Sequence, residues 1–389
     1  MKKTFTILFA FLMLIFSLQS MAQSVGHKSV TYTDPARSRS IACEIYYPAT
    51  SAGDNTPLAS GQFPVIVFGH GFMMTYSAYA YFYNAMAPLG YIVVLPTTEG
   101  SMSPSHADFG ADLAFLINQM KTEGLSSSSF FYQHVAAKSA VMGHSMGGGA
   151  SFLACKNNTI PTCMVTFAEA NTTPSSVTAA QSVTIPTLVI SGSVDCVAPP
   201  AAHQAMAYDS LASACKVFIS ITNGCHCYFG DYSFYCTLAE QTCDITPPLA
   251  RANQETTTLN FVKLYLNFYL KNNAASWTVF LDSLNTRPEI THQISCPVTT
   301  GIVNTLKTYN TITIWPNPTD DKLNVRFQAE GNYTIRIIDA IGRQSYSEKT
   351  GSTTGETTET LNISMLKKGI YFIEVDNNKN KNYSKIVKQ

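Results

Sequence analysis

No part of this chain constrains its fold as strongly as residues 143–147, which read Gly-His-Ser-Met-Gly. They follow the apolar run 140–142, typical of a buried strand, and precede Gly-Gly-Ala at 148–150, where a helix can begin. A serine at such a junction lies on a tight turn with its hydroxyl raised above the sheet. The glycines on either side are needed because a Cβ there would collide with neighbouring backbone. The segment therefore predicts a strand, a sharp turn with Ser145 at its tip, and a helix.

Apolar runs alternate with helix-like stretches from about Val30 to Leu270, and these runs are continuous rather than alternating in polarity. They are PVIVFG at 64–69, YIVVL at 91–95, AVMG at 140–143, CMVTF at 163–167, PTLVIS at 186–191 and KVFISI at 216–221. Continuous apolar strands separated by helices belong to a mostly parallel sheet that is covered on both faces. We therefore predict an α/β architecture built on a doubly wound, mostly parallel sheet.

The two ends of the chain differ from this α/β part. Residues 1–22 have a charged start, an apolar stretch and small residues before a cleavage site, a pattern typical of a secretory signal peptide. Residues 311–389 are rich in Thr, Asn and Lys and alternate in polarity at 323–327 and 333–337, which predicts a small all-β sandwich. We expect the α/β domain over residues 23–298 and a linker over residues 299–310.

The charge balance excludes some classes of partner. The chain has 25 Lys and Arg against 25 Asp and Glu, and only 13% of its residues are charged. A neutral, weakly charged chain offers little attraction to a phosphate backbone or an anionic membrane. We expect no nucleic-acid partner, and we expect a monomer.

Ser145 needs two partners to act as a nucleophile, because a serine hydroxyl reacts poorly without a base and an acid that orients the base. In doubly wound hydrolases these residues follow in the order Ser, Asp or Glu, then His. Asp195 comes after the run at 186–191, and His226 comes after the next run at 216–221. Both lie at carboxyl ends of neighbouring strands, where such sheets bind ligands. We predict a catalytic triad of Ser145, Asp195 and His226.

Other acids and histidines are weaker candidates. Glu169, just past the run at 163–167, is the alternative acid. His144 is next to the nucleophile, but on a sharp turn its ring should point away from Ser145. The remaining candidates are interpreted as surface histidines: His27, His134, His203 and His292.

An oxyanion intermediate requires two backbone N–H donors. We expect one from Met146, the residue after the nucleophile, and one from Phe72, in the glycine-containing loop at 69–72. Phe72 and Met146 are also expected to bind substrate. Tyr228 and Phe229, directly after His226, are predicted to form walls of the substrate groove. The aromatic residues at 76–83 are interpreted mainly as helix core.

These segments resemble the bacterial cutinase-like polyester hydrolases, the group that includes poly(ethylene terephthalate) hydrolases. The resemblance covers about Val30 to Leu270 and rests on GHGF at 69–72, GHSMGGG at 143–149 and DCVAP at 195–199. It implies an α/β-hydrolase fold, the triad named above, an oxyanion hole from Phe72 and Met146, and an acyl groove lined by Phe72. The family usually has a Trp after the strand preceding the acid, whereas residues 167–171 read FAEAN here.

The last 80 or so residues carry a second resemblance, to the carboxyl-terminal sorting domain of type IX secretion cargo. It rests on WPNPT at 315–319, LKKGIY at 366–371 and KIVK at 385–388. It implies export across the outer membrane by the secretion machinery, with the tail either removed or anchored at the cell surface.

All ten cysteines lie between Cys43 and Cys296, and an even number in an exported chain favours disulfides over metal sites. Cys155 with Cys163, and Cys236 with Cys243, are close enough in sequence to form short loops. We also hypothesise that Cys196 pairs with Cys225 or Cys227, which would join the acid loop to the base loop.

Together these features predict a secreted serine ester hydrolase that requires no cofactor and no metal. Polyester or cutin-like substrates are the first expectation, and soluble short-chain esters or lipids are the alternative. A hypothesis from another class is a surface binding protein that keeps a hydrolase scaffold without turnover.

Overall fold

The computed structural model describes residues 23–243, 249–297, 312–339, 344–346, 349–376 and 381–389. The predicted signal peptide at 1–22 and the predicted linker at 299–310 lie outside these residues. The chain divides into two compact units, with the boundary between residues 297 and 298. Each unit is described by itself.

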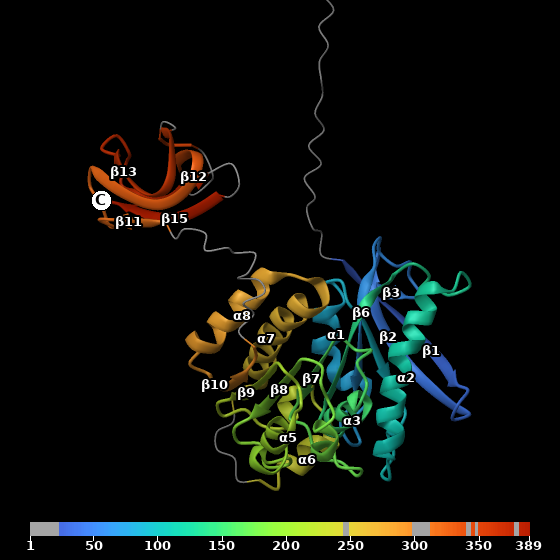
Figure 1. Ribbon diagram of the computed structural model, residues 1–389. Coiled ribbons are helices and arrows are strands. Elements are labelled where there is room, and N and C mark those ends of the chain that lie inside the picture. The colour runs from blue at the N-terminus through green and yellow to red at the C-terminus, as the bar shows by residue number, and fades with distance from the viewer. Residues whose placement is uncertain (1–22, 244–248, 298–311, 340–343, 347–348, 377–380) are drawn as a thin grey trace, which may run out of the picture. The chain divides into compact units, whose positions relative to one another are not determined.

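The described part of the first unit contains a ten-stranded sheet whose central strands are parallel, in the order β10-β9-β8-β7-β6-β4-β5-β2-β1-β3 (Figure 1). The parallel strands are β4 (Phe63–Gly69), β5 (Ile92–Pro96), β6 (Val135–His144), β7 (Cys163–Phe167), β8 (Thr187–Gly192) and β9 (Lys216–Ile221). The predicted α/β fold is confirmed, since each predicted strand run is found in this parallel part.

Antiparallel strands lie at both edges and were not among the predicted runs. β1 (Ser24–Asp34) and β2 (Arg39–Ala49) form a hairpin that joins the sheet beside β5, and β10 (Ile290–Ser295) runs antiparallel to β9. The two-residue strand β3 (Gly53–Asp54) pairs with β1. Several residues in these strands are exposed, so they lack the continuous apolar character of a buried strand.

Helices cover both faces of this sheet. Their bounds are α1 (Ala80–Met86), α2 (His106–Leu125), α3 (Met146–Cys155), α4 (Ser176–Ala180), α5 (Gln204–Ser210), α6 (Phe234–Glu240), α7 (Arg251–Lys271) and α8 (Ala274–Thr286). Short 3-10 turns add η1 (Tyr76–Tyr79), η2 (Pro200–Ala202) and η3 (Cys227–Phe229). Among the described residues, no helix combines the length and the apolar character needed to cross a bilayer.

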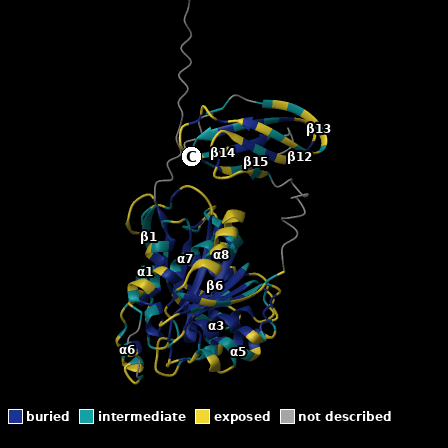
Figure 2. Cartoon of the chain, turned by 90° about the vertical axis from the view of Figure 1, so that its left-hand side faces the viewer, coloured by how far each residue is buried: buried dark blue, intermediate teal, exposed yellow. Residues whose placement is uncertain are grey.

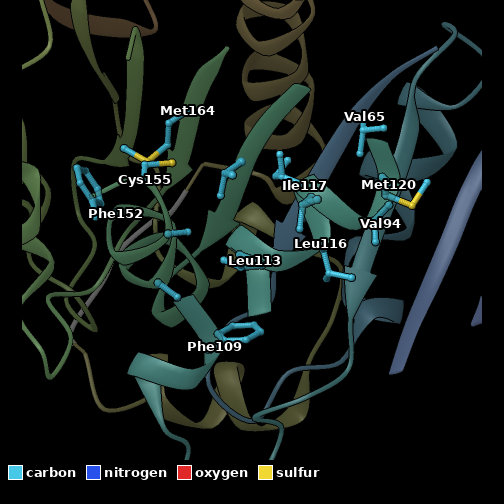
Figure 3. Packing of buried hydrophobic residues seen from close by; sticks show 14 of the residues in the cluster. Val65, Val94, Phe109, Leu113, Leu116, Ile117, Met120, Phe152, Cys155 and Met164 are labelled. Atoms are coloured by element: carbon cyan, nitrogen blue, oxygen red, sulfur yellow. The ribbon is translucent and has the colours of Figure 1, made fainter. Parts of the chain in front are cut away.

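Successive strand residues point to opposite faces, and each face packs against its own helices. On one face, Val65 and Val94 pack with Leu113, Leu116 and other residues of α2, as Figure 3 shows. On the other face the strands pack against α1, α7 and α8. The buried residues concentrate in the central strands and in α3 (Figure 2). This double burial explains why the predicted strands are apolar at every position.

The second unit is all-β. Its described strands are β11 (Thr313–Trp315), β12 (Lys322–Asp339), β13 (Lys349–Asn362), β14 (Gly369–Asp376) and β15 (Lys381–Lys388), and their pairings are antiparallel. The alternating residues Leu323, Val325 and Phe327 are buried, as are Tyr333, Ile335 and Ile337. The predicted alternation of polarity is therefore confirmed.

The turn at Ser145 depends on a close approach between β4 and the start of α3. A Cβ on Gly147 would overlap the backbone carbonyl of Gly69, at the carboxyl end of β4. Gly69 is in register with Gly143 of β6, so both strands end at the same level. Glycine at 147 lets α3 begin against the loop that follows β4.

We predict that Gly147→Ala destabilises the first unit by about 3 kcal/mol or more, because backbone must move to admit the methyl group. Gly100→Ala is the control, since a Cβ there would have its nearest contact at 3.8 Å, on the Thr97 carbonyl. It should change stability by about 0.5 kcal/mol or less. Urea unfolding of the purified chains measures both values, and equal stability of the two variants would contradict the packing described.

Candidate active site

The fold brings Ser145, Asp195 and His226 into one hydrogen-bonded chain. Ser145 follows β6, Asp195 follows β8 and His226 follows β9, all at the carboxyl edge of the parallel strands. The Ser145 hydroxyl donates to Nε2 of His226 at 2.9 Å, and Nδ1–H of His226 donates to Oδ2 of Asp195 at 2.7 Å. All three residues are buried. The predicted acid, base and nucleophile thus have the contacts that proton transfer requires.

The Asp195 carboxylate is held from its other side. Backbone N–H groups of Val197 and Ala198 donate to Oδ1 at 3.0 and 2.8 Å, which leaves Oδ2 to accept from His226. Hydrogen bonds from N–H groups to a carboxylate are stronger than neutral ones. They orient Asp195, and through it the imidazole ring.

The backbone at Ser145 is strained, as the sharp turn predicts. Ser145 has φ 54° and ψ −119°, a conformation that is costly for a non-glycine residue. Hydrogen bonds with neighbouring segments hold it there. Its N–H donates to the Phe167 carbonyl at 2.9 Å, and its carbonyl accepts from the N–H groups of Gly149 and Ala170, both at 3.0 Å. The nucleophile is therefore pre-positioned by β7 and α3.

The two expected oxyanion donors lie on the segments that flank Ser145. Met146 is the first residue of α3, and the first N–H groups of a helix have no partner within the helix. Phe72 follows Gly71 in the loop after β4, and its side chain lines the same pocket as Ser145. The oxyanion hole from these two residues stays a prediction.

A pocket of about 330 Å³ opens beside Ser145 and His226. Its other lining residues are Phe72, Met73, Met74, Met102, Val197, Tyr235, Cys236, Leu238, Ala239 and Thr242. None of these described lining residues is Lys, Arg, Asp or Glu. The volume is near the lower end of the range for small-molecule sites, so the pocket can enclose one small apolar group.

Three of the expected substrate-binding residues lie elsewhere. Phe229 is fully buried and stacks on Phe167 at 5.8 Å between ring centroids, because the 3-10 turn η3 directs it into the core. Tyr228 lies under the guanidinium of Arg251, at 4.2 Å, beside a separate pocket. The Met146 side chain is buried in the core under α3. The pocket beside Ser145 is lined instead by Phe72 and by residues of α6 (Tyr235, Cys236, Leu238 and Ala239), a helix that no sequence motif indicates. The role of Phe72 in substrate binding stays a prediction.

Tyr79 and His144 connect the loop of Phe72 to the loop of His226. The Gly71 N–H donates to the Tyr79 hydroxyl at 2.8 Å, and this hydroxyl lies 3.0 Å from Nδ1 of His144. Nε2 of His144 lies 3.1 Å from the carbonyl oxygen of His226. A carbonyl only accepts, so Nε2 carries the proton and Nδ1 accepts from Tyr79.

Burial holds the pKa of His144 well below its usual value, and the nearby His226 adds to this effect. His144 is therefore neutral, in agreement with the single proton that its hydrogen bonds require. No sequence pattern indicates these hydrogen bonds, because Tyr79 lies in an aromatic run typical of a helix core. Tyr79 is buried as expected, but its hydroxyl has a second role.

Nδ1–H of His226 donates to Asp195 and not to Glu169, the alternative acid. It is fully buried, and the Ser176 hydroxyl donates to its Oε2 at 3.2 Å. Burial raises the pKa of Glu169 to about 8, so the carboxyl keeps its proton at neutral pH. A neutral carboxyl would stabilise an imidazolium less than the Asp195 carboxylate does.

The disulfide hypotheses were wrong. Cys196 pairs with Cys243, Cys227 pairs with Cys236, and Cys215 pairs with Cys296. The acid and base loops are thus not bonded to each other, because α6 and the turn after it supply a partner for each. Free thiols remain in the described residues at Cys43, Cys155, Cys163 and Cys225, so the proposed short loops are not formed.

Comparison with known proteins gives two family matches. Residues 19–239 match the family model described as PET hydrolase-like, and residues 313–389 match the model of a secretion system C-terminal sorting domain.

Curated relatives match a shorter part of the chain. Cutinase est1 of Thermobifida alba is 28% identical over 171 residues, which are 44% of this chain and 55% of that protein. A bis(hydroxyethyl) terephthalate hydrolase of Streptomyces coelicolor is 27% identical over 186 residues, 47% of this chain and 54% of that protein. The chain thus spans about half the length of these relatives.

We predict that Tyr79→Phe destabilises the first unit by about 1–3 kcal/mol, because the buried Gly71 N–H and His144 Nδ1 both lose their partner. Tyr132→Phe is the control, since Tyr132 is exposed, and it should change stability by about 0.5 kcal/mol or less. Urea unfolding compares the two. A loss of stability no larger for Tyr79→Phe than for the control would contradict the hydrogen bonds described for the Tyr79 hydroxyl.

Proposed function

The chain belongs to the PET hydrolase-like family, and from this premise we propose that it is an exported serine ester hydrolase that uses Ser145, His226 and Asp195. The observation that carries the proposal is the hydrogen-bonded chain of these three side chains, of which Ser145 and His226 line an apolar pocket. The similarity to a cutinase and to a terephthalate ester hydrolase supports the same reaction class.

In the proposed mechanism, Ser145 Oγ attacks the ester carbonyl carbon while Nε2 of His226 takes its proton. Asp195 stabilises the imidazolium that forms. The N–H groups of Met146 and Phe72 stabilise the oxyanion, whose negative charge develops only as the tetrahedral intermediate forms. His226 then gives the proton to the leaving alcohol. Water activated by His226 releases the acyl group and restores Ser145.

We propose polyester or cutin-like substrates first. An apolar surface around the pocket supports this choice, because Phe72, Met102, Tyr235 and Leu238 line the pocket and are also exposed to solvent. Such a surface can lie against an insoluble apolar ester. The pocket's small volume also fits soluble esters of one acyl group, which are the second candidate.

The proposed site of action is outside the cell or at its surface. The sorting-domain match over residues 313–389 supports export by a secretion system. We propose that the signal peptide at residues 1–22 starts this export and that outer-membrane machinery recognises the tail.

We predict that Ser145→Ala lowers kcat for p-nitrophenyl acetate by about 10⁴-fold or more, because the nucleophile is lost while the rest of the site remains. His292→Ala is the control, since His292 lies on the edge strand β10, and it should keep full activity. Continuous absorbance of nitrophenolate measures both.

Equal rates for wild type and Ser145→Ala would contradict the proposed hydrolase activity. They would leave a surface binding protein on a hydrolase scaffold as the explanation. Release of soluble acids from a polyester film, followed by chromatography, separates the two substrate candidates. Activity on p-nitrophenyl acetate without film release would favour soluble esters.

A further inference from the structure

Two disulfides tie one short segment, α6 and the turn after it, to both catalytic loops. Cys196 directly follows Asp195 and pairs with Cys243, just past α6. Cys227 directly follows His226 and pairs with Cys236, within α6. The acid loop and the base loop are therefore both bonded to the segment at residues 234–243, which we call the strap.

The strap has an apolar face and a polar face. Tyr235, Leu238, Ala239 and Thr242 line the pocket of Ser145. The first three lie on one side of α6, at spacings of three and four residues, and Thr242 lies in the turn that follows. The opposite side carries Thr237, Glu240 and Gln241, which line a separate pocket of about 350 Å³. The Cys227 N–H donates to Glu240 at 3.1 Å on that side. The strap thus separates an apolar space from a polar one.

Little of the strap is buried in the core. Cys236 is the buried residue of α6, whereas Phe234, Tyr235 and Leu238 are 61%, 51% and 51% exposed. A helix of this length with so little buried apolar surface has little stability of its own. Its position is therefore determined mainly by the two disulfides.

We propose that the strap is the wall that selects the acyl group: it makes esters of uncharged, apolar acyl chains the preferred substrates. The inference rests on the proposed function and adds the substrate class. Tyr235 and Leu238 would cover an acyl chain that extends from Ser145, and burial of its CH₂ groups against these side chains would favour binding.

The rest of the pocket lining suits chains of different shape. Met73, Met74 and Met102 line the pocket together with Phe72, and methionine side chains adapt to irregular apolar groups. An acetyl group has one methyl beyond its carbonyl and is too short to use the strap. Acyl chains of several carbons reach it, so the strap matters only for the longer substrates.

The test compares p-nitrophenyl acetate with p-nitrophenyl octanoate. We expect Leu238→Ala combined with Tyr235→Ala to lower kcat/KM for octanoate about tenfold, mainly through KM, and to change the value for acetate less than twofold. Val279→Ala is the matched control, because Val279 is 51% exposed, as Leu238 is, and lies on α8, outside the strap and the pocket lining. It should leave both values unchanged.

A second pair of variants tests the disulfides. Cys196→Ser with Cys243→Ser frees one end of the strap, and we expect the ratio of octanoate to acetate kcat/KM to fall severalfold. Cys215→Ser with Cys296→Ser removes the disulfide that is not bonded to the strap and should keep the ratio. The ratio does not depend on the folded fraction, since unfolded chains lower both rates alike.

Three outcomes separate the claims. Selective loss of octanoate hydrolysis in the strap variants, with the control variants unchanged, supports the proposal. Unchanged selectivity, or equal loss for both esters, overturns it while the proposed function stands. If the wild type hydrolyses neither ester, the proposed function fails first, and the strap has no acyl group to select.

Discussion

The hydrogen bond from the Ser145 hydroxyl to His226 is the interaction on which the function of this structure depends. Its two residues are far apart in sequence and meet because β6 and β9 end at the same edge of a parallel sheet. The close approach at Gly147, the strained backbone of Ser145 and the N–H groups that hold Asp195 all serve this contact. These features thus hold in place the groups through which the proton of Ser145 would be transferred to His226.

The sequence was sufficient to predict the position of a side chain where that position follows from its place on a strand. The continuous apolar runs predicted the parallel sheet, and the strand ends predicted that Ser145, Asp195 and His226 would meet. It was insufficient where the direction of a side chain depends on the geometry of a local turn. Phe229 follows His226 directly, yet a 3-10 turn directs it into the core, so proximity in sequence did not make it a groove wall.

Contacts between polar groups that are far apart along the chain could also not be predicted from the sequence. Tyr79 and His144 meet only in the folded chain, and an apolar pattern carries no information about where a buried hydroxyl points. The disulfide pairings could not be predicted from the sequence for a similar reason. The position of each cysteine next to a triad residue was informative, but the strap that receives both disulfides has too few buried residues to be recognised as part of the site. Covalent bonds replace core packing there, as the oxidising surroundings that follow from the proposed export allow.

The most direct measurement is covalent labelling of the whole chain with an uncharged p-nitrophenyl phosphonate ester, followed by peptide mass spectrometry. The serine oxygen displaces nitrophenolate from phosphorus, so the reaction requires an activated hydroxyl. We expect one adduct per chain, on Ser145, and a rate at least about a hundredfold lower in His226→Ala. An adduct on another residue, or equal labelling of Ser145 in wild type and His226→Ala, would contradict the catalytic contact between these side chains.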